Sequence, residues 1–387
     1  MSAAKVSITR ASGYDCDRVY AGLEQGIENI GGISDLIKPG TRVLLKINHL
    51  PPASPAERGI VTHPVFTEAV VRLLKKTGAE ITVGDDIESA RGFQVSGYDE
   101  MCRRNGVALL NLREKGLTDT PLNGRSLKSA HLSTFALEAD VIVNLPKMKT
   151  HALMVMTGGI KNMYGLLPSG PRIRYHGEYS RRDDFSNMLV DIFAAVRPQI
   201  TIMDGIIAME GQGPSSGSLR EMGLILASRD TVALDTVVAR IMGLSVADVG
   251  AIKWAVERGI GVGDLNDIEI IGEPLKNVIA PGFKLPAGVT SSLTSRAPEA
   301  ITRHMMNQYA PRPRILKRRC TACMECVKVC PVEALTESGG KPEIDYNKCI
   351  GCMCCHEACR YRAIESRRTV AGNIMHGFIS GWEKMMG

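Results

Sequence analysis

Two cysteine runs near the C-terminus constrain the fold of this chain more than any other feature. The first reads CTACMECVKVC from residue 320 and the second reads CIGCMCCHEAC from residue 349. Both follow the pattern C-x2-C-x2-C-x3-C, and each cysteine of the first run recurs 29 residues later. Met324 and Met353 keep the same offset, so the segment is an internal duplication. Nine of the 11 cysteines lie in it, which indicates that the rest of the chain forms a separate unit.

The duplicated runs resemble the bacterial-type ferredoxin module that holds two [4Fe–4S] clusters. A cubane cluster needs thiolates from several directions, and a tight C-x2-C-x2-C loop supplies three of them. In that family the fourth cysteine of each run binds the other cluster. The resemblance therefore implies two ligand sets: Cys320, Cys323, Cys326 and Cys359 for cluster 1, and Cys349, Cys352, Cys355 and Cys330 for cluster 2.

Zinc and disulfides are the alternatives to iron–sulfur clusters. Zinc ribbons use paired C-x2-C motifs, whereas two triple-cysteine runs supply more thiolates than one tetrahedral ion takes. Disulfides are rare in reducing compartments, and MSAAKVSITR at the start lacks the apolar core of a secretory signal.

The second run departs from the first at two positions. Arg360 follows the second run where Pro331 follows the first, and Cys354 aligns with Glu325. Glutamate is not a regular cubane ligand, so we expect Cys354 to be a spare thiol that packs beside cluster 2. A redox or ligand-exchange role for Cys354 is the alternative.

The chain before the cysteine runs alternates strand-like and helix-like segments. Strand candidates are residues 42–47, 80–84, 107–112, 139–145 and 198–204, and helix candidates are 63–78, 95–106, 187–197 and 231–243. Strands that alternate with helices predict βαβ units and a mostly parallel sheet. We therefore predict an α/β fold class: a large domain over residues 1–275, with a mostly parallel sheet and flanking helices, plus a small α+β ferredoxin-like domain at 313–368.

Two further segments fall outside these domains. Residues 276–312 lose the alternation and are rich in Pro, Ser and Thr, which is typical of a linker or wrap-around segment. Residues 369–387 form a tail in which Ile374, Phe378, Trp382 and Met386 share one helical face. We expect that face to pack on the protein itself; a partner or a membrane surface is the alternative.

Composition and charge exclude several classes of protein. The net charge of +6 is too mild for a dedicated nucleic-acid binder. No apolar stretch reaches the 18 or more residues of a transmembrane helix. With no export signal, these features predict a cytoplasmic protein. The basic residues at 311–319 and 360–368 are solvated surface charge or a docking face for an acidic redox partner or a membrane surface.

Polar side chains follow four of the predicted strands. They are Asn48 and His49, then Asp85 and Asp86, then Lys147, Lys149 and His151, and finally Asp204. In an open parallel sheet, ligands bind outside the carboxyl ends of the strands. If residues 146–151 are extended, the side chains of Lys147, Lys149 and His151 point the same way. We expect them to meet at one edge of the sheet.

These residues suit a small anion. Lys147, Lys149, Lys161, Asn48 and Asn162 are the candidate substrate-binding residues for a carboxylate, phosphate or nucleotide. A solvated basic loop is the alternative interpretation.

Four of these residues are candidates for catalysis. His151 and His49 are the candidates for proton transfer, because imidazole titrates near neutral pH. Asp85 and Asp86 are candidates for a base or a metal ligand. The loop EGQGPSSGS at 210–218 matches neither a dinucleotide fingerprint nor a P-loop and is expected to be mobile. A flavin or another small ligand is neither marked nor excluded.

Seven short motifs together resemble the family called domain of unknown function 362. They are KINHL (46–50), TVGDD (82–86), NLPKMKTH (144–151), GGIKNMYG (158–165), MDG (203–205), EGQGP (210–214) and DTVALD (230–235). Members of this family are often described as iron–sulfur proteins, and some carry a C-terminal ferredoxin module. The resemblance implies this architecture but supplies no reaction and no catalytic residues.

Two functions remain open at this point. The first is an iron–sulfur oxidoreductase that passes electrons to or from a small anion at the strand ends. The second is a non-enzymatic electron carrier or adaptor whose large domain docks a partner enzyme. Both functions imply a redox partner protein. Storage of clusters or of metal is a third option.

Overall fold

The structure is a computed structural model that describes residues 3–51, 53–87, 91–286 and 311–368. Its strands are β1 (Ala4–Arg10), β2 (Arg42–Ile47), β3 (Glu80–Asp85), β4 (Ala108–Asn111), β5 (Leu117–Pro121), β6 (Ser129–Ser133), β7 (Val141–Leu145), β8 (Lys147–His151), β9 (Val155–Thr157), β10 (Ile200–Glu210), β11 (Ser218–Ser228), β12 (Ile268–Gly272), β13 (Arg312–Ile315), β14 (Leu335–Ser338), β15 (Lys341–Ile344) and β16 (Ile364–Arg367). Its helices are α1 (Cys16–Asn29), α2 (Pro64–Lys75), α3 (Arg91–Ser96), α4 (Tyr98–Asn105), α5 (Thr134–Glu138), α6 (Gly159–Asn162), α7 (Ser169–Glu178), α8 (Arg182–Ala195), α9 (Thr231–Ile241), α10 (Gly250–Glu257), α11 (Leu275–Val278), α13 (Glu325–Lys328) and α14 (Cys354–Glu357).

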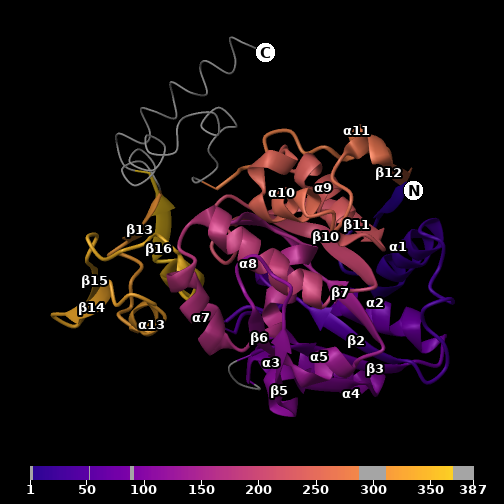
Figure 1. Cartoon of the computed structure of the whole chain (residues 1–387), viewed down its shortest axis with the longest axis horizontal. Coiled ribbons are helices and arrows are strands. Elements are labelled where there is room, and N and C mark those ends of the chain that lie inside the picture. Colours follow the sequence, from indigo (N-terminus) through magenta and orange to yellow (C-terminus); the bar gives the residue numbers. More distant parts are fainter. Residues whose placement is uncertain (1–2, 52, 88–90, 287–310, 369–387) are drawn as a thin grey trace, which may run out of the picture.

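One large sheet organises the first domain (Figure 1). Its strands run in the order β12-β1-β11-β10-β7-β2-β3-β4, and β8 pairs with β10 and β9. The central pairs β10–β7, β7–β2, β2–β3 and β3–β4 are parallel, whereas β11 is antiparallel to both β1 and β10. The predicted α/β class with a mostly parallel sheet is confirmed.

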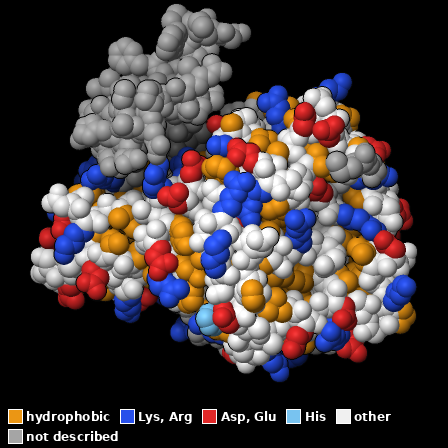
Figure 2. All heavy atoms as spheres, in the orientation of Figure 1, with side chains coloured by type: hydrophobic (Ala, Val, Ile, Leu, Met, Phe, Trp, Pro, Cys, Tyr) orange, Lys and Arg blue, Asp and Glu red, His pale blue; other side chains and the backbone are white. Residues whose placement is uncertain are grey.

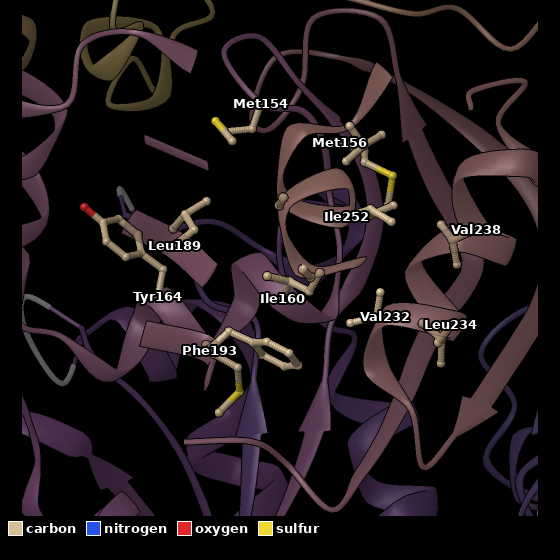
Figure 3. Packing of buried hydrophobic residues seen from close by; sticks show 14 of the residues in the cluster. Met154, Met156, Ile160, Tyr164, Leu189, Phe193, Val232, Leu234, Val238 and Ile252 are labelled. Carbon is tan, nitrogen blue, oxygen red and sulfur yellow. The ribbon is translucent and has the colours of Figure 1, made fainter. Parts of the chain in front are cut away.

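Helices cover both faces of this sheet because successive strand residues point to opposite sides. Val43 and Leu45 of β2 pack in a core with α1, α2 and α4. Leu44, between them, belongs to the other core, which α8, α9 and α10 close. Figure 3 shows part of that second core, where Ile160 lies among side chains such as Phe193 and Val232. The sheet is therefore buried on both sides, as parallel sheets usually are.

Three boundaries differ from the sequence prediction. The strand predicted at 198–204 continues to Glu210, so Asp204 lies in the middle of β10 rather than at the end of the strand. The helix predicted at 95–106 is two helices, α3 and α4, that meet at Gly97 with φ 82°. Val278 and Phe283 are buried in the core, so the start of the predicted linker belongs to the large domain. Residues 287–310 and the tail with Ile374, Phe378, Trp382 and Met386 lie outside the described residues.

The cysteine-rich module repeats its backbone as well as its sequence. β13 pairs with β16 and β14 with β15, and α13 and α14 each follow a cysteine loop. Left-handed backbone conformations recur at the 29-residue offset, in Ala322 and Gly351, Met324 and Met353, and Glu333 and Arg362. Side chains other than glycine rarely adopt this conformation. The two halves of the duplication therefore share the same backbone conformation around their cysteine runs.

The module lies beside α7, and contacts tie it to the large domain (Figure 1). Gln212 and Ser366 exchange two hydrogen bonds, from Gln212 Nε2 to the Ser366 carbonyl at 3.1 Å and from the Ser366 amide to Gln212 Oε1 at 3.0 Å. Pro331 lies so close to Gly177 that a Cβ there would approach it at 3.2 Å. Gly213 and Ser215 are also buried, so the loop expected to be mobile is a packed part of the domain contact.

The surface on the face shown in Figure 2 carries mixed charge. Lysine and arginine side chains are interspersed there with aspartate and glutamate rather than gathered into one basic field.

Candidate functional site

Two cavities in the module are each lined by one of the cysteine sets that the ferredoxin resemblance implies. Cys320, Cys323, Cys326 and Cys359 line the first cavity, together with residues such as Ile315 and Tyr361. Cys330, Cys349, Cys352 and Cys355 line the second, together with residues such as Pro313 and Leu335. The fourth cysteine of each run thus faces the other run's cavity.

The thiols surround space rather than converge on a point. Among the described residues, no three His, Cys, Asp or Glu side chains lie close enough together to hold a single metal ion. A cubane takes one thiolate at each of its four irons, which suits thiols that stand around a cavity. The backbone amides of Ala334 and Ala363 donate to Cys330 Sγ and Cys359 Sγ, each at 3.2 Å. Such hydrogen bonds stabilise the negative charge of cluster thiolates.

The two cavities differ in the exposure of one cysteine. Two cysteines of each set are buried, Cys326 and Cys359 in the first cavity and Cys352 and Cys355 in the second, but Cys323 of the first is exposed. We call the first the outer cavity and the second the inner cavity, because α14 beside the second contacts the large domain. Cys354 lines the inner cavity and is buried. A hydrogen bond to Cys352 and burial both raise the pKa of the Cys354 thiol.

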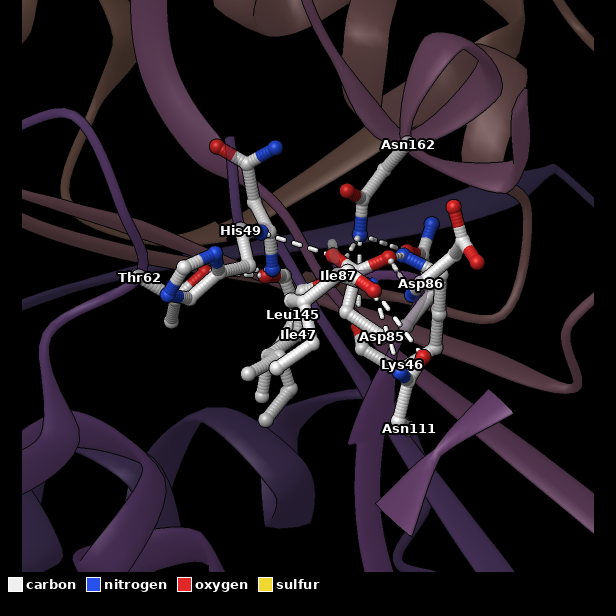
Figure 4. Close-up of polar contacts among 12 residues, drawn as sticks. Lys46, Ile47, His49, Thr62, Asp85, Asp86, Ile87, Asn111, Leu145 and Asn162 are labelled. Carbon is white, nitrogen blue, oxygen red and sulfur yellow. Dashed lines mark hydrogen bonds and ion pairs between the residues drawn. The ribbon is translucent and has the colours of Figure 1, made fainter. Parts of the chain in front are cut away.

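The parallel strands bring the predicted polar residues to one edge of the sheet. Lys46 of β2 is level with Gly84 of β3 and Asn144 of β7, so the residues after them are neighbours. Figure 4 shows the network in the middle of this edge. Lys46 Nζ lies 2.8 Å from Asp85 Oδ1, and the His49 amide donates to Asp85 Oδ2 at 2.7 Å. Asn162 Nδ2 donates to Asn144 Oδ1 at 2.7 Å.

Several candidates are engaged by internal partners. Lys147 Nζ lies 2.8 Å from Asp204 Oδ2, and both side chains are buried. Asp86 pairs with Arg113, at 2.7 Å, and with Arg172. Removing one member of such a buried pair leaves the other charge uncompensated, so these side chains are committed to each other rather than to a ligand. The prediction that Lys147 and Lys149 extend together along one strand agrees with β8, but Lys147 is directed to Asp204 rather than to a shared ligand.

The His49 side chain is buried against α3. Its Nε2 lies 3.2 Å from Ser96 Oγ and 3.3 Å from the Gly92 carbonyl, and its ring meets Phe93 edge-on. Burial lowers the pKa of His49 to about 4. His49 Nδ1 and the neighbouring Asn48 Oδ1 are buried without a hydrogen-bond partner in the described chain.

A second group of polar side chains lies where this edge meets the module. We call it the interdomain cluster and define it as Lys149, His151, Lys161, His176 and Glu357. His151 Nε2 lies 3.1 Å from Glu357 Oε1, which reaches over from α14. The two atoms are not aligned for a hydrogen bond, and His176 Nδ1 is likewise buried without a partner in the described part of the chain. Lys149 donates to the Ile60 carbonyl.

The charges of the interdomain cluster perturb one another. Burial would raise the pKa of Glu357, but His151, Lys161 and His176 hold it well below its ordinary value. Burial, with the nearby Lys161, lowers the pKa of Lys149 to about 7. Burial lowers the pKa of Lys161 as well, and the carboxylate of Glu357 is the main effect that opposes it. Lys149 can therefore gain or lose a proton near neutral pH, unlike an ordinary lysine.

The glycine pair in GGIKNMYG serves the fold. A Cβ on Gly158 would lie 2.4 Å from Asp235 Oδ1, and one on Gly159 would lie 2.4 Å from Thr231 Cγ2. The absent side chains let Asp235 accept from the amides of Gly159 at 2.7 Å and Ile160 at 3.0 Å, at the start of α6. The close backbone approach that this glycine pair allows is thus used by Asp235, and it positions Lys161 and Asn162.

Sequence reasoning missed His176, Glu357, Gln212 and Ser215. Ser215 Oγ lies 3.4 Å from the His356 carbonyl and 3.3 Å from the Glu357 carbonyl. A signal for Glu357 did exist in the duplication, because the position 29 residues earlier holds Lys328. His176 and Gln212 carried no comparable mark.

Comparison with known proteins agrees with this architecture. Residues 43–240 match the domain of unknown function DUF362, and residues 312–360 match the 4Fe-4S dicluster domain. The chain belongs to the DUF362 family and carries an iron–sulfur module with an electron-transfer role.

Two individual proteins are similar to this chain. It is 36% identical over 249 residues to the thylakoid-associated protein sll1697 of Synechocystis sp., covering 63% of this chain and 76% of that protein. The lactate racemase apoprotein from Thermoanaerobacterium thermosaccharolyticum aligns with a TM-score of 0.44 and 10% identity, over 63% of this chain and 58% of the racemase. Within the described ranges, no helix is both long and apolar enough to cross a membrane.

Proposed function

We propose that this protein is an iron–sulfur oxidoreductase that passes electrons, through two [4Fe–4S] clusters, to or from a small anionic substrate or cofactor at the strand-end edge. The cysteines of the outer and inner cavities would hold the clusters, which supply one-electron transfer when bound. A flavin would be one such cofactor.

One observation carries the proposal: between the strand ends and the module, several buried polar atoms make no aligned hydrogen bond among the described residues. They are Asn48 Oδ1, His49 Nδ1, His176 Nδ1 and the ion-paired atoms His151 Nε2 and Glu357 Oε1. An unpaired buried polar atom is costly, so such atoms usually meet a water, an ion or a ligand. Lys149 and Lys161 add positive charge beside them, which favours an anion.

The chain's own residues suit a step that couples protons to electrons. With its pKa near 7, Lys149 can exchange a proton at neutral pH. His151 and Asn48 would orient the anion, while Lys147, Asp85 and Asp86, which are committed to ion pairs, would hold the edge rigid. The inner cavity lies toward this edge and the outer one toward solvent, so electrons would enter at the outer cavity.

The test is anaerobic purification followed by mass spectrometry of released small molecules. We expect an anion that oxidises or reduces the clusters when it is added back, as followed by the visible absorbance of the clusters. Lys149→Met should slow that exchange at least tenfold. Lys328→Met, an exposed lysine of the module, should leave it unchanged. If no small molecule exchanges electrons with the fully loaded protein, the oxidoreductase proposal fails.

The adaptor function is the second candidate, and the exposed Cys323 favours it. Three exposed basic residues, Lys317, Arg318 and Arg319, directly precede Cys320 of the outer cavity, and an acidic protein can dock there. Transfer to a partner protein that continues unchanged in Lys149→Met would support this function instead. We also propose a cytoplasmic location, as expected from the sequence. The similar Synechocystis protein is named as thylakoid-associated.

A further inference from the structure

The duplicated module offers a matched comparison between its two halves. Lys328 and Glu357 occupy equivalent positions, two residues after Cys326 and Cys355. The side chain of Lys328 is 67% exposed and pairs with Glu325 at 2.9 Å, whereas that of Glu357 is 14% exposed. The halves therefore differ in charge at the position where the second half meets the large domain.

Glu357 brings a carboxylate into a group of cationic and imidazole side chains. Its Oε1 lies 3.1 Å from His151 Nε2, and His151 is fully buried. Lys161 and His176 also influence this carboxylate, and both come from segments beside the strand ends, α6 and α7. A carboxylate is the kind of group that such a site would select from solution.

The fit of Glu357 in this group is incomplete. Glu357 Oε1, His151 Nε2 and His176 Nδ1 all lack an aligned hydrogen bond in the described chain. A free carboxylate can rotate to satisfy such donors, whereas Glu357 is tethered to α14. The contacts of α14 with the loop at 211–217 are long, at 3.3 and 3.4 Å from Ser215 Oγ. Hydrogen bonds of this length are weak, so the 3.1 Å contact with His151 is the closer of these interactions of α14.

We propose that His151, Lys161 and His176 form a binding site for a small carboxylate or a similar oxyanion, and that Glu357 fills it as an internal ligand. An external anion displaces the Glu357 side chain and takes over its partners. This inference rests on the proposed function, because it names the ligand class of the same edge and the group that competes for it.

The test measures acetate binding to the cluster-loaded protein by calorimetry, with no electron transfer involved. Glu357→Ala removes the internal carboxylate, and we expect it to bind acetate at least tenfold tighter than the unmodified protein. Lys328→Ala, at the matched position of the other half, should bind acetate as the unmodified protein does. Glu357→Ala combined with Lys161→Met should lose the gain. Equal acetate affinity in Glu357→Ala and the unmodified protein would overturn the proposal.

A second measurement covers the case in which Glu357→Ala loses its clusters. The apoprotein is then reconstituted with iron and sulfide, with and without acetate. Recovery of iron content only with acetate supports the site, whereas failure with acetate overturns it. Acetate is a redox-inert probe, so its binding tests this site alone. The oxidoreductase function fails separately, if no small molecule exchanges electrons with the loaded protein, so the two failures are distinguishable.

Discussion

At the scale of single residues, position alone separates side chains of the same type. Cys354 and Cys355 are adjacent and both line the inner cavity, yet only Cys355 has a cysteine at the matched position of the first half, Cys326. Lys147 and Lys149 lie two residues apart on β8, but one is paired with Asp204 and the other has its pKa lowered to about 7. The partner, rather than the residue type, decides the role.

Cys354→Ser should leave both clusters in place. The spare thiol is not needed if four other cysteines surround the inner cavity, so we expect about eight irons per chain, as for two cubanes. Iron analysis and the paramagnetic signal of the reduced protein check this, with Cys355→Ser as the control that loses iron. Loss of iron in Cys354→Ser would mean that Cys354 is a ligand.

His49 should make stability depend on pH below neutrality. Burial lowers its pKa to about 4 in the folded protein, whereas the unfolded chain takes up the proton near its ordinary value of about 6.5. The contribution of neutral His49 is therefore complete above about pH 6.5 and is lost as the pH falls toward 4, by on the order of 3 kcal/mol. Thermal unfolding between pH 7 and pH 5 should show a shallower pH dependence in His49→Gln. An identical slope would contradict this.

At the scale of elements, close packing gives short motifs their composition. Gly158 and Gly159 are required because Asp235 and Thr231 occupy the space that side chains would fill. The extension of β10 to Glu210 carries the following loop to the module, where Gln212 binds Ser366. These contacts join segments that are far apart in the chain.

Gly158→Ala should destabilise the large domain by about 1–3 kcal/mol, the usual cost of overpacking. The added Cβ would collide with the Asp235 carboxylate that holds the start of α6. Chemical unfolding of the loaded protein measures this. Gly170→Ala is the matched control, since Gly170 lies in α7 with open space around it and alanine favours helices. Equal stability of the two variants would argue against the packing role.

At the scale of the whole molecule, the placement of the module orders the two cavities. The inner one lies toward the strand-end edge, and Cys354, which lines it, is among the groups that affect the pKa of Lys161. The outer one opens to solvent at Cys323. Positive charge near one cluster stabilises its reduced form and raises its potential.

Lys161→Met should lower the reduction potential of cluster 2 and leave cluster 1 unchanged. A buried unit charge at this range has an effect on the order of tens of millivolts. A redox titration followed by electron paramagnetic resonance separates the two clusters. Lys328→Met, which removes an exposed and screened charge, should shift neither by a comparable amount. Equal shifts of both clusters would contradict the assigned order.

The sequence alone determined the α/β class, the duplicated module and the meeting of polar residues at one edge. Those conclusions rest on local repeats, such as the spacing from Cys320 to Cys349 and the polar residues that follow each buried strand. Only the tertiary structure decided which polar groups are engaged: Lys147 by Asp204, Asp85 by Lys46, and His151 with Glu357. Such pairs join residues between 39 and 206 positions apart. No local pattern encodes them, because charge pairing depends on distance in space and on burial rather than on spacing along the chain.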